Sequence, residues 1–222
     1  MKRSVQQAYQ PLARKPRGPR DIPTEVKDHQ LVSRRRREIV DAAVTLFIQK
    51  GFHKTTTREI ARAAGFSIGT LYEYVASKED VLYLVCDAIH QEVEKRLKQR
   101  IMAGGNGART LEAAIEVYFH VCDQMADHIL LIYQETASLP PESMRYVLAN
   151  EERVTAIFSD ILERGVEDYS LKPLDRGEIA LMAHNIAVLG HMWAFRRWSL
   201  ARHFTLEQYA RQQSDLIMGA LV

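Results

Sequence analysis

Apolar residues recur along this chain at the three- and four-residue spacing of amphipathic helices, and no stretch shows the alternation and hairpin turns of β-strands. The first such pattern runs from a capping Ser33 to about Lys50. Three glycines within residues 104–107 end a later one, because glycine sustains a helix poorly. The pattern predicts an all-α protein of about nine helices. Their expected ranges are 33–50, 56–64, 68–75, 77–103, 110–125, 129–138, 142–167, 175–200 and 205 to near the C-terminus.

Residues 55–80 predict two short helices joined by a tight turn and followed by a longer helix. Thr56 and Glu59 have the spacing of a capping box, in which each side chain satisfies a backbone N–H near the other. Gly65 can end this helix, since a residue without Cβ turns at no steric cost. Ser67 is placed to cap the next helix. Two short helices joined in this way suit the major groove of DNA, which admits one α-helix, so the spacing predicts a DNA-reading protein.

Residues 38–82 closely resemble the DNA-binding region of TetR-type transcriptional regulators. Val75 departs from the family, which usually has Phe at this position, and we expect slightly looser packing of this helix. The match covers about one fifth of the chain. The matching residues are Ile39, Ala42-Ala43, Leu46-Phe47, Gly51, Thr55-Thr56, Ile60-Ala61, Ala64-Gly65-Phe66-Ser67, Gly69, Leu71-Tyr72 and Ser77-Lys78-Glu79.

The resemblance implies a homodimer that binds a roughly palindromic DNA operator and is released from it by a small-molecule effector. The last two helices of each chain would form a four-helix interface. The intrachain core is an equal alternative for one of the large apolar residues on these helices, Trp193. The full set that fits the interface is Leu189, Met192, Trp193, Leu216, Ile217 and Leu221.

The resemblance also assigns DNA contacts within the predicted recognition helix and around it. In the family, the residues matching Tyr72 and Lys78 typically touch phosphates, and those matching Ser67, Thr70 and Tyr74 lie at or near the groove. The other members are predicted from the sequence pattern and not from the resemblance. They are exposed positions of the recognition helix, or hydroxyl and basic residues at the starts of helices. The predicted DNA-binding set is Arg34, Arg35, Arg36, Arg37, Thr56, Thr57, Ser67, Ile68, Gly69, Thr70, Tyr72, Tyr74 and Lys78.

Thr56 and the run Arg34–Arg37 each have an alternative explanation that does not involve DNA. Thr56 is at least as well explained by its role in the capping box. Arg34–Arg37 would occupy the first turn of the first helix, where their charge opposes the helix dipole, which indicates that they face an anion such as DNA phosphate. Solvated charge, helped by neighbouring acidic residues, is the competing explanation.

Basic residues gather in the first third of the chain. The net charge is +2, but residues 1–80 hold 16 Lys and Arg against 9 Asp and Glu, which leaves 14 against 19 for the rest. Residues 1–32 read as a disordered basic arm, before a helix-turn-helix domain over 33–80 and a ligand-binding and dimerisation domain over 81–222. Residues 14–20 loosely resemble an AT-hook core, whose arginines can enter a narrow minor groove. A nonspecific basic tail is the favoured alternative.

An apolar set with a few polar groups in the later helices fits an effector pocket, although an ordinary core looks similar. Arg196, Arg197 and Trp198 close the eighth helix, where positive charge suits the helix C-terminus, and binding of an acidic ligand such as an acyl-CoA is the weaker alternative. The predicted ligand-binding set is Tyr118, Phe119, Cys122, Met125, Tyr133, Phe158, His184 and Asn185.

Other functions are disfavoured. His184 and His191 are seven residues apart, whereas metal-binding pairs on one helix usually sit four apart, so neither a metal nor another cofactor is expected. Nucleophile and phosphate-loop motifs of enzymes are missing from the sequence. No run of about 18 apolar residues suggests a membrane span, and the two cysteines suit a reduced core, so we expect a cytoplasmic protein. The sequence predicts a DNA-binding transcriptional repressor, with a protein-interaction module as the alternative.

Overall fold

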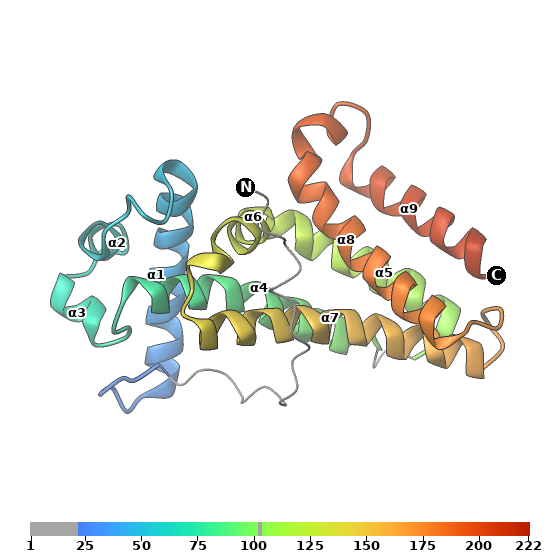
Figure 1. Ribbon diagram of the computed structural model, residues 1–222, viewed down its shortest axis with the longest axis horizontal. Coiled ribbons are helices and arrows are strands. Elements are labelled where there is room, and N and C mark those ends of the chain that lie inside the picture. Colours follow the sequence, from blue (N-terminus) through green and yellow to red (C-terminus); the bar gives the residue numbers. More distant parts are fainter. Residues whose placement is uncertain (1–21, 102–103) are drawn as a thin grey trace, which may run out of the picture.

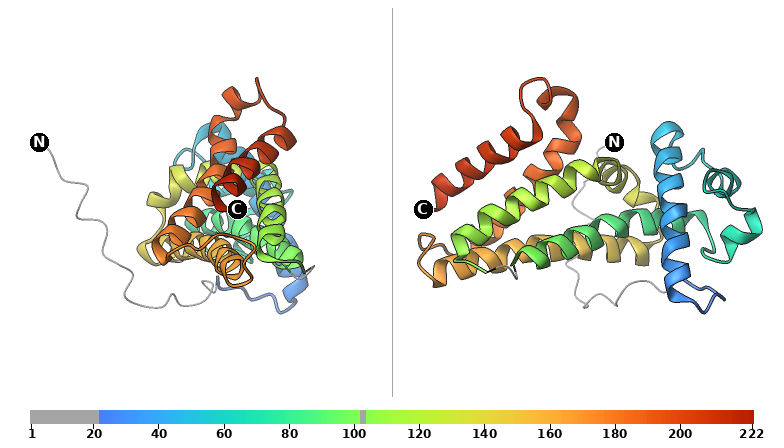
Figure 2. Two further views of the ribbon diagram at one scale, coloured as in Figure 1. Left: turned by 90° about the vertical axis from the view of Figure 1, so that its right-hand side faces the viewer. Right: turned by 180° about the vertical axis from the view of Figure 1, so that it is seen from behind.

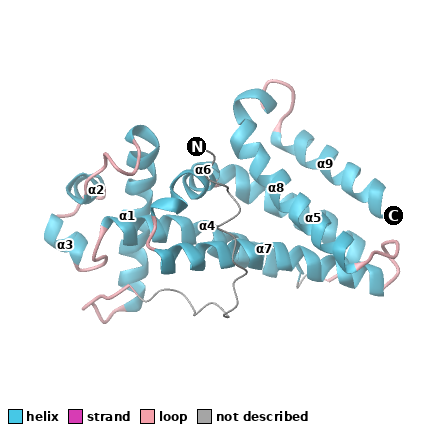
Figure 3. Cartoon of the chain, in the orientation of Figure 1, coloured by secondary structure: helices cyan, strands magenta, loops and turns pink. Residues whose placement is uncertain are grey.

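The structure is a computed structural model that describes residues 22–101 and 104–222. Within this part of the chain the backbone forms nine α-helices, one short 3-10 helix and loops, and no strand (Figures 1 and 3). The predicted all-α class is therefore confirmed. The prediction of a disordered arm falls mainly on residues 1–21, which lie outside the described residues.

Three helices form a small unit at one end of the molecule (Figure 1). Their apolar faces meet around Phe47, Ile60 and Leu71, all of which are buried. We call this unit, together with residues 22–28, the head. Its helices are α1 (His29–Lys50), α2 (Thr57–Ala63) and α3 (Ile68–Tyr72).

The first helix begins earlier than expected. Asp28, rather than Ser33, is its N-cap, and the Asp28 carboxylate accepts hydrogen bonds from the backbone N–H groups of Gln30 and Leu31 at 2.9 and 3.0 Å. The boundary of the predicted arm at residue 32 is thus wrong, because residues 22–32 belong to the folded head. Arg34–Arg37 consequently lie beyond the first turn of the helix, so the argument from the helix dipole does not apply to them.

The C-terminal domain is built around one central helix. α5 packs mainly against α4, α7, α8 and α9 and also touches α6, which crosses over the bundle beside the head (Figures 1 and 2). α4 leaves the head and runs into this domain without a break. The helices of the C-terminal domain are α4 (Lys78–Ile101), α5 (Gly107–Gln124), α6 (Ala126–Glu135), the 3-10 helix η2 (Thr136–Ser138), α7 (Pro141–Glu167), α8 (Arg176–Leu200) and α9 (Leu206–Leu221).

Glycine permits a close contact between α5 and α8. A Cβ built on Gly190 of α8 would lie 2.5 Å from the Tyr118 ring of α5 and 3.0 Å from the sulfur of Cys122. Because any larger residue would push the two helices apart, Gly190 fixes how closely α8 approaches the centre of the domain. This contact lies at the cluster that the sequence predicts as the effector pocket.

Candidate nucleic-acid interface and effector core

The capping box that begins α2 is present as predicted. The Thr56 N–H donates to Glu59 Oε2 at 2.9 Å, and the Glu59 N–H donates to Thr56 Oγ1. Lys50 forms an ion pair with the same carboxylate. The hydrogen bond from Lys50 and those from Thr56 together lower the pKa of Glu59 to about 2. Thr56 therefore holds α2 in place, as the structural alternative for this residue proposed.

Short polar side chains line the exposed side of the helix-turn-helix. Ser67 caps α3 as predicted, and its Oγ lies 2.9 Å from Thr70 Oγ1. Thr57 Oγ1 and Tyr72 Oη are 3.1 Å apart, which joins the start of α2 to the end of α3. Half of the Tyr72 surface is exposed. The turn between the helices is made by Gly65, whose φ of +76° is the left-handed conformation expected there.

Lys78 is engaged inside the head. Its ammonium donates to the carbonyl oxygens of Phe52, His53 and Thr55 at 2.8, 3.3 and 2.9 Å, and it lies 4.4 Å from the centre of the Phe52 ring. An ammonium group has three N–H donors, so all of them are used. Lys78 thus fixes the connection between α1 and α2, and a phosphate contact would require it to give up one of these bonds.

Tyr74 does not face the groove. Its side chain is 4% exposed, because the expected recognition helix over 68–75 ends at Tyr72 and the following turn directs Tyr74 into the head. The expectation that Tyr74 is an exposed reading residue is therefore wrong. Ile68, Gly69 and Thr70 remain at least partly exposed.

Residues 22–28 tie down the end of the recognition helix, and sequence reasoning missed them. Thr24 Oγ1 donates to the Glu73 carbonyl at 2.7 Å. Arg36 donates from Nε to the Tyr74 carbonyl at 3.0 Å and from Nη2 to the Ile22 carbonyl at 2.7 Å. Ile22 itself is 1% exposed. We call residues 22–28 the strap. Its only sequence signal is an apolar residue inside a polar, proline-containing stretch.

The four arginines predicted to face DNA divide into two groups. Arg36 supports the strap, and Arg35 lies 2.8 Å from Glu38 and 5.0 Å from the centre of the Phe66 ring. Arg34 and Arg37 are exposed. The second pair is therefore the part of the run that is open to a phosphate.

A buried polar cluster joins α4 to α7 in the C-terminal domain. His90 Nε2 lies 2.6 Å from Glu151 Oε1, and Asn150 donates to Asp87 at 3.3 Å. Burial raises the pKa of Asp87, whereas His90 holds the pKa of Glu151 below its usual value against the effect of burial. Sequence reasoning missed this cluster, because its members are 61 or more residues apart.

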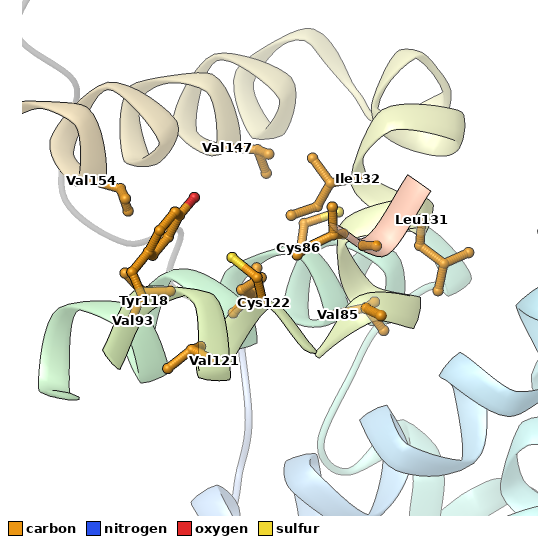
Figure 4. Packing of buried hydrophobic residues seen from close by; sticks show 14 of the residues in the cluster. Val85, Cys86, Val93, Tyr118, Val121, Cys122, Leu131, Ile132, Val147 and Val154 are labelled. Atoms are coloured by element: carbon orange, nitrogen blue, oxygen red, sulfur yellow. The ribbon is translucent and has the colours of Figure 1, made fainter. Parts of the chain in front are cut away.

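Four of the predicted ligand residues come together in the core. The Tyr118 ring lies 5.2 Å from the Phe158 ring and 6.1 Å from the Phe119 ring, and Cys122 follows Tyr118 one turn later on α5. All four are buried, and Figure 4 shows Tyr118 and Cys122 among the surrounding valines. Burial raises the pKa of Cys122, which keeps it a neutral thiol. Met125 lies apart from them, half-buried at the end of α5.

His191 stands at the centre of a hydrogen-bonded chain of aromatic residues. Tyr118 Oη lies 3.2 Å from the Ala187 carbonyl, to which it donates, and 2.9 Å from His191 Nε2. Tyr133 Oη lies 3.0 Å from His191 Nδ1. This arrangement fits a neutral imidazole, and burial lowers the pKa of His191 accordingly. Tyr133 packs 4.7 Å from the Phe195 ring and covers His191 from the solvent side, with 56% of its own surface exposed.

His184 and Asn185 are exposed, so neither belongs to the buried cluster around Tyr118. His184 shares a helix face with His191, but His191 is covered by Tyr133 of α6. Exposed apolar residues lie around these two exposed residues on α8 and α9: Leu181, Val188 and Leu216 are 64%, 54% and 70% exposed.

The apolar residues expected at the dimer interface are only partly available to it. Leu216 is exposed, whereas Trp193, Ile217 and Leu221 are buried within the chain, and Leu189 and Met192 are half-buried. Trp193 Nε1 donates to Asp123 at 2.7 Å, so Trp193 lies in the intrachain core, which was the alternative to the dimer interface.

Side chains pack closely in the core of the C-terminal domain, where Tyr118, Phe119 and Phe158 are at most 1% exposed. The gap between α4 and α7 is a cavity of about 10 Å³, which has room for roughly one water. Its lining includes the buried His90 and Asn150. His90 Nδ1 has no hydrogen-bond partner among the described residues. Across the same residues, no group of His, Cys, Asp and Glu is suited to a metal ion, and no helix is long and apolar enough to cross a membrane.

The end of α8 carries an exposed pairing of a cation with an aromatic ring. The Arg196 guanidinium lies 5.1 Å from the centre of the Trp198 ring, and Trp198 is 64% exposed. Arg197, by contrast, forms an ion pair with Asp123 at 2.6 Å. Arg196 and Trp198 are therefore the members of this group that are open to a ligand.

Two family models match the chain. The model of the bacterial regulatory proteins of the tetR family matches residues 39–83, and the model of the tetracyclin repressor-like C-terminal domain matches residues 104–221. The second match alone spans more than half of the chain.

Individual relatives are similar in sequence to this chain over most of their length. HbdR of Aromatoleum sp. (strain CIB), an HTH-type transcriptional regulator, is 27% identical over 191 residues, which are 86% of this chain and 82% of that protein. KstR2 of Rhodococcus jostii (strain RHA1), an HTH-type transcriptional repressor, is 25% identical over 201 residues, 90% of this chain and 97% of that protein.

Among solved structures, AibR in complex with isovaleryl coenzyme A and operator DNA has a TM-score of 0.69 at 18% identity, covering 83% of this chain and 98% of that one. A tetR-family regulatory protein from Rhodococcus RHA1 has a TM-score of 0.72 at 24% identity, covering 83% and 95%. These likenesses extend the agreement to the fold of most of the chain.

Proposed function

Because the chain belongs to the TetR family of bacterial regulatory proteins, we propose that this DNA-binding transcriptional regulator is a homodimeric repressor released by an apolar effector. The relative KstR2 is a repressor by name. The proposal concerns the mode of action, the residues that carry it and the class of effector.

One observation carries the proposal: α4 belongs to both functional regions. Lys78 at its start holds the connection between α1 and α2, and His90 farther along the same helix binds Glu151 of α7 in the buried polar cluster. A second link joins the head to η2, where Ser138 Oγ lies 3.3 Å from His53 Nε2. A rearrangement of α4 against α7 therefore changes the position of the head.

The DNA-reading surface would consist of the exposed polar side chains of the helix-turn-helix. Ser67, Thr70 and Tyr72 of α3 face the groove, Thr57 and Tyr72 form a hydroxyl pair suited to one phosphate, and Arg34 and Arg37 reach phosphates from α1. Lys78 and Arg36 act indirectly, by positioning these groups. No arginine lies on α3, so specificity would depend strongly on the shape of the DNA backbone.

The exposed apolar residues of α8 and α9 would be covered by a second copy of the chain. Leu181 and Val188 lie seven residues apart on one face of α8, and they and Leu216 of α9 are apolar side chains that a monomer would leave in water. The two recognition helices of the dimer would then lie about 34–36 Å apart, one turn of DNA.

The effector would bind in the core around Tyr118, Cys122 and Phe158, with Tyr133 and His191 at the entrance. Because this core is closely packed, a ligand must separate the helices, and binding is thereby coupled to the head. Coupling of about 1–3 kcal/mol, common for allosteric pairs, would change DNA affinity by roughly 5- to 150-fold.

A coenzyme A thioester of a small apolar acid fits this site best. Its acyl group would enter past Tyr133 and Phe195, and its anionic nucleotide would meet Arg196 and Trp198, since guanidinium binds phosphate and indole stacks on a base. The structural neighbour AibR is in complex with such a thioester, isovaleryl coenzyme A.

The decisive experiment measures DNA binding and its release. Fluorescence anisotropy compares the duplex upstream of the chain's own coding region with a shuffled duplex at the same salt, and we expect a preference of at least about a thousandfold. Acyl-CoA esters of increasing chain length are then added. Arg196→Gln should weaken release at least tenfold, whereas Arg109→Gln, which removes an exposed charge elsewhere, should not. Binding to neither duplex would refute the DNA-reading role, and binding without release by any ester would refute the effector class.

A further inference from the structure

The recognition helix α3 is short, and its end depends on other parts of the head. It has five residues, Ile68–Tyr72, whereas isolated helices below about 12–15 residues are marginal in water. Ser67 caps its start. The carbonyl oxygens of Glu73 and Tyr74, directly after the helix, accept no backbone N–H from any described residue, so they are open to donors from side chains.

The strap and α1 supply those donors. Thr24 Oγ1 donates to the Glu73 carbonyl at 2.7 Å, and Arg36 Nε donates to the Tyr74 carbonyl at 3.0 Å. The same guanidinium donates from Nη2 to the carbonyl of Ile22, which is 1% exposed. Figure 1 shows the strap before α1, on the side of the head where α3 ends. The strap is thus bonded to the turn that follows the recognition helix, 49 residues farther along the chain.

Both connections have a defined geometry. The Val26 N–H donates to the Thr24 hydroxyl oxygen at 3.2 Å, which limits the rotation of that hydroxyl within the strap. The planar guanidinium of Arg36 holds its N–H donors in fixed directions, so it sets the position of the Tyr74 carbonyl relative to that of Ile22. A lysine at this position would keep the charge but not the planar fork.

We propose that Thr24 and Arg36 are positioning residues for the recognition helix, and that the sequence-specific reader begins at residue 22 rather than at residue 39, where the match to the family model starts. The inference rests on the proposed DNA-reading function. Neither residue has to touch DNA, because Tyr72 is followed at once by the residue whose carbonyl Thr24 holds. A displaced helix end loses its alignment with the groove, whereas attraction to phosphates does not depend on sequence. The strap should therefore raise affinity for the operator without raising affinity for other DNA.

A single hydroxyl tests the strap. The full-length protein selects its operator from a randomised pool of duplexes, and a shuffled duplex at the same salt is the comparison. Thr24→Val removes the donor to Glu73, so it should weaken operator binding by about three- to tenfold and leave binding to the shuffled duplex unchanged. Thr24→Ser keeps the hydroxyl and should keep the operator affinity. Thr45→Val, which removes a hydroxyl that donates to the Asp41 carbonyl within α1, should change neither affinity.

Arg36→Lys separates positioning from charge. It keeps the cation, so the slope of log affinity against log salt should stay native. Operator affinity should nevertheless fall by about tenfold, because one planar fork no longer holds the carbonyls of Tyr74 and Ile22. Arg109→Lys makes the same chemical change at an exposed arginine of the C-terminal domain, and it should bind both duplexes as the native protein does.

The outcomes distinguish this inference from the proposed function. Native operator affinity in Thr24→Val or Arg36→Lys would overturn the inference. So would an equal loss on both duplexes, which would indicate a less stable head or a lost phosphate contact, and so would a Thr24→Ser variant that binds as weakly as Thr24→Val. In each of these cases the native protein still prefers its operator, and the DNA-reading function stands. If the native protein selects no duplex from the pool, the proposed function and the inference fail together.

Discussion

The head and the C-terminal domain use polar side chains in opposite ways. In the head, Thr57, Ser67 and Tyr72 stay at the surface, and the caps that begin α2 and α3 join residues three apart. In the C-terminal domain, His90 and His191 are buried and bind partners 58 to 73 residues away. The starts of the two reading helices are therefore set by local bonds, whereas the polar network of the other domain exists only when several helices pack together.

The largest loss of stability should follow a substitution in the core of the C-terminal domain. Phe158→Ala removes a fully buried ring that packs 5.2 Å from Tyr118, and it should lower the free energy of unfolding by about 3–5 kcal/mol. Leu148→Ala on the same helix, where the residue is 44% exposed, should cost much less. Urea unfolding followed by circular dichroism measures both. Similar losses for the two variants would show that this core is not the main source of stability.

The head should respond most strongly to the loss of its internal lysine. Lys78→Ala removes the Lys78 donor from the Thr55 carbonyl oxygen and leaves the Phe52 carbonyl only the Thr55 N–H at 3.2 Å, and an unpaired buried polar group costs about 1–3 kcal/mol. DNA affinity should fall as a consequence, because the connection between α1 and α2 loses its anchor. Lys54→Ala, at an exposed neighbouring lysine, serves as the control. Weaker DNA binding with unchanged stability would instead make Lys78 a direct phosphate contact.

Acid should destabilise the C-terminal domain and the head over different pH ranges. Burial keeps His191 neutral in the fold, with its pKa below the ordinary 6.5, although the nearby Glu151 carboxylate opposes this. The unfolded chain binds the proton first, so stability is complete above about pH 6.5 and declines as the pH falls toward the folded pKa, by at most about 1.4 kcal/mol per unit for one histidine. His128, whose pKa burial also lowers, adds to the same window.

The head loses stability through titration only at lower pH. The pKa of Glu59 is lowered to about 2, so the stability it provides is present above about pH 4.5 and is lost as the pH falls toward 2. Unfolding at pH 8, 5.5 and 4 should show a shallower loss between pH 8 and 5.5 for His191→Gln. Between pH 8 and 5.5, Glu59→Gln should lose as much stability as the native protein, whereas below about pH 4.5 it should lose less, because it no longer has the carboxylate that titrates there. The opposite assignment of the two windows would contradict the burial argument.

The contrast between local and long-range bonds explains which features could be predicted from the sequence. The capping box at Thr56 and the helix starts at Asp175 and Thr205 were predicted correctly, because each of these capping boxes depends on residues three positions apart. The first helix was given too late a start, since Asp28 lies in a stretch without an apolar pattern, and Tyr74 was assigned to the surface because a helix was extended through a turn.

The candidate effector site was only half predictable. The spacing of Tyr118, Phe119 and Cys122 marks one buried helix face, and the structure joins it to Phe158. His184 and His191 have equivalent positions on a helix, so periodicity cannot tell that α6 covers only the second. The pairing of His90 with Glu151 depends on how α4 lies against α7, which no local pattern contains.

The smallest effect concerns a single hydroxyl on the reading surface. Tyr72→Phe keeps the ring and removes the oxygen that lies 3.1 Å from Thr57 Oγ1. Because the side chain is half exposed, stability should hardly change, while the loss of a phosphate hydrogen bond should weaken operator binding by roughly three- to tenfold, about 0.7–1.4 kcal/mol. Tyr169→Phe, at a tyrosine that is 93% exposed in the C-terminal domain, should do neither. A Tyr72→Phe variant with native affinity would mean that the ring, not the hydroxyl, meets the DNA, and that surface polar groups in the head only shape its helices.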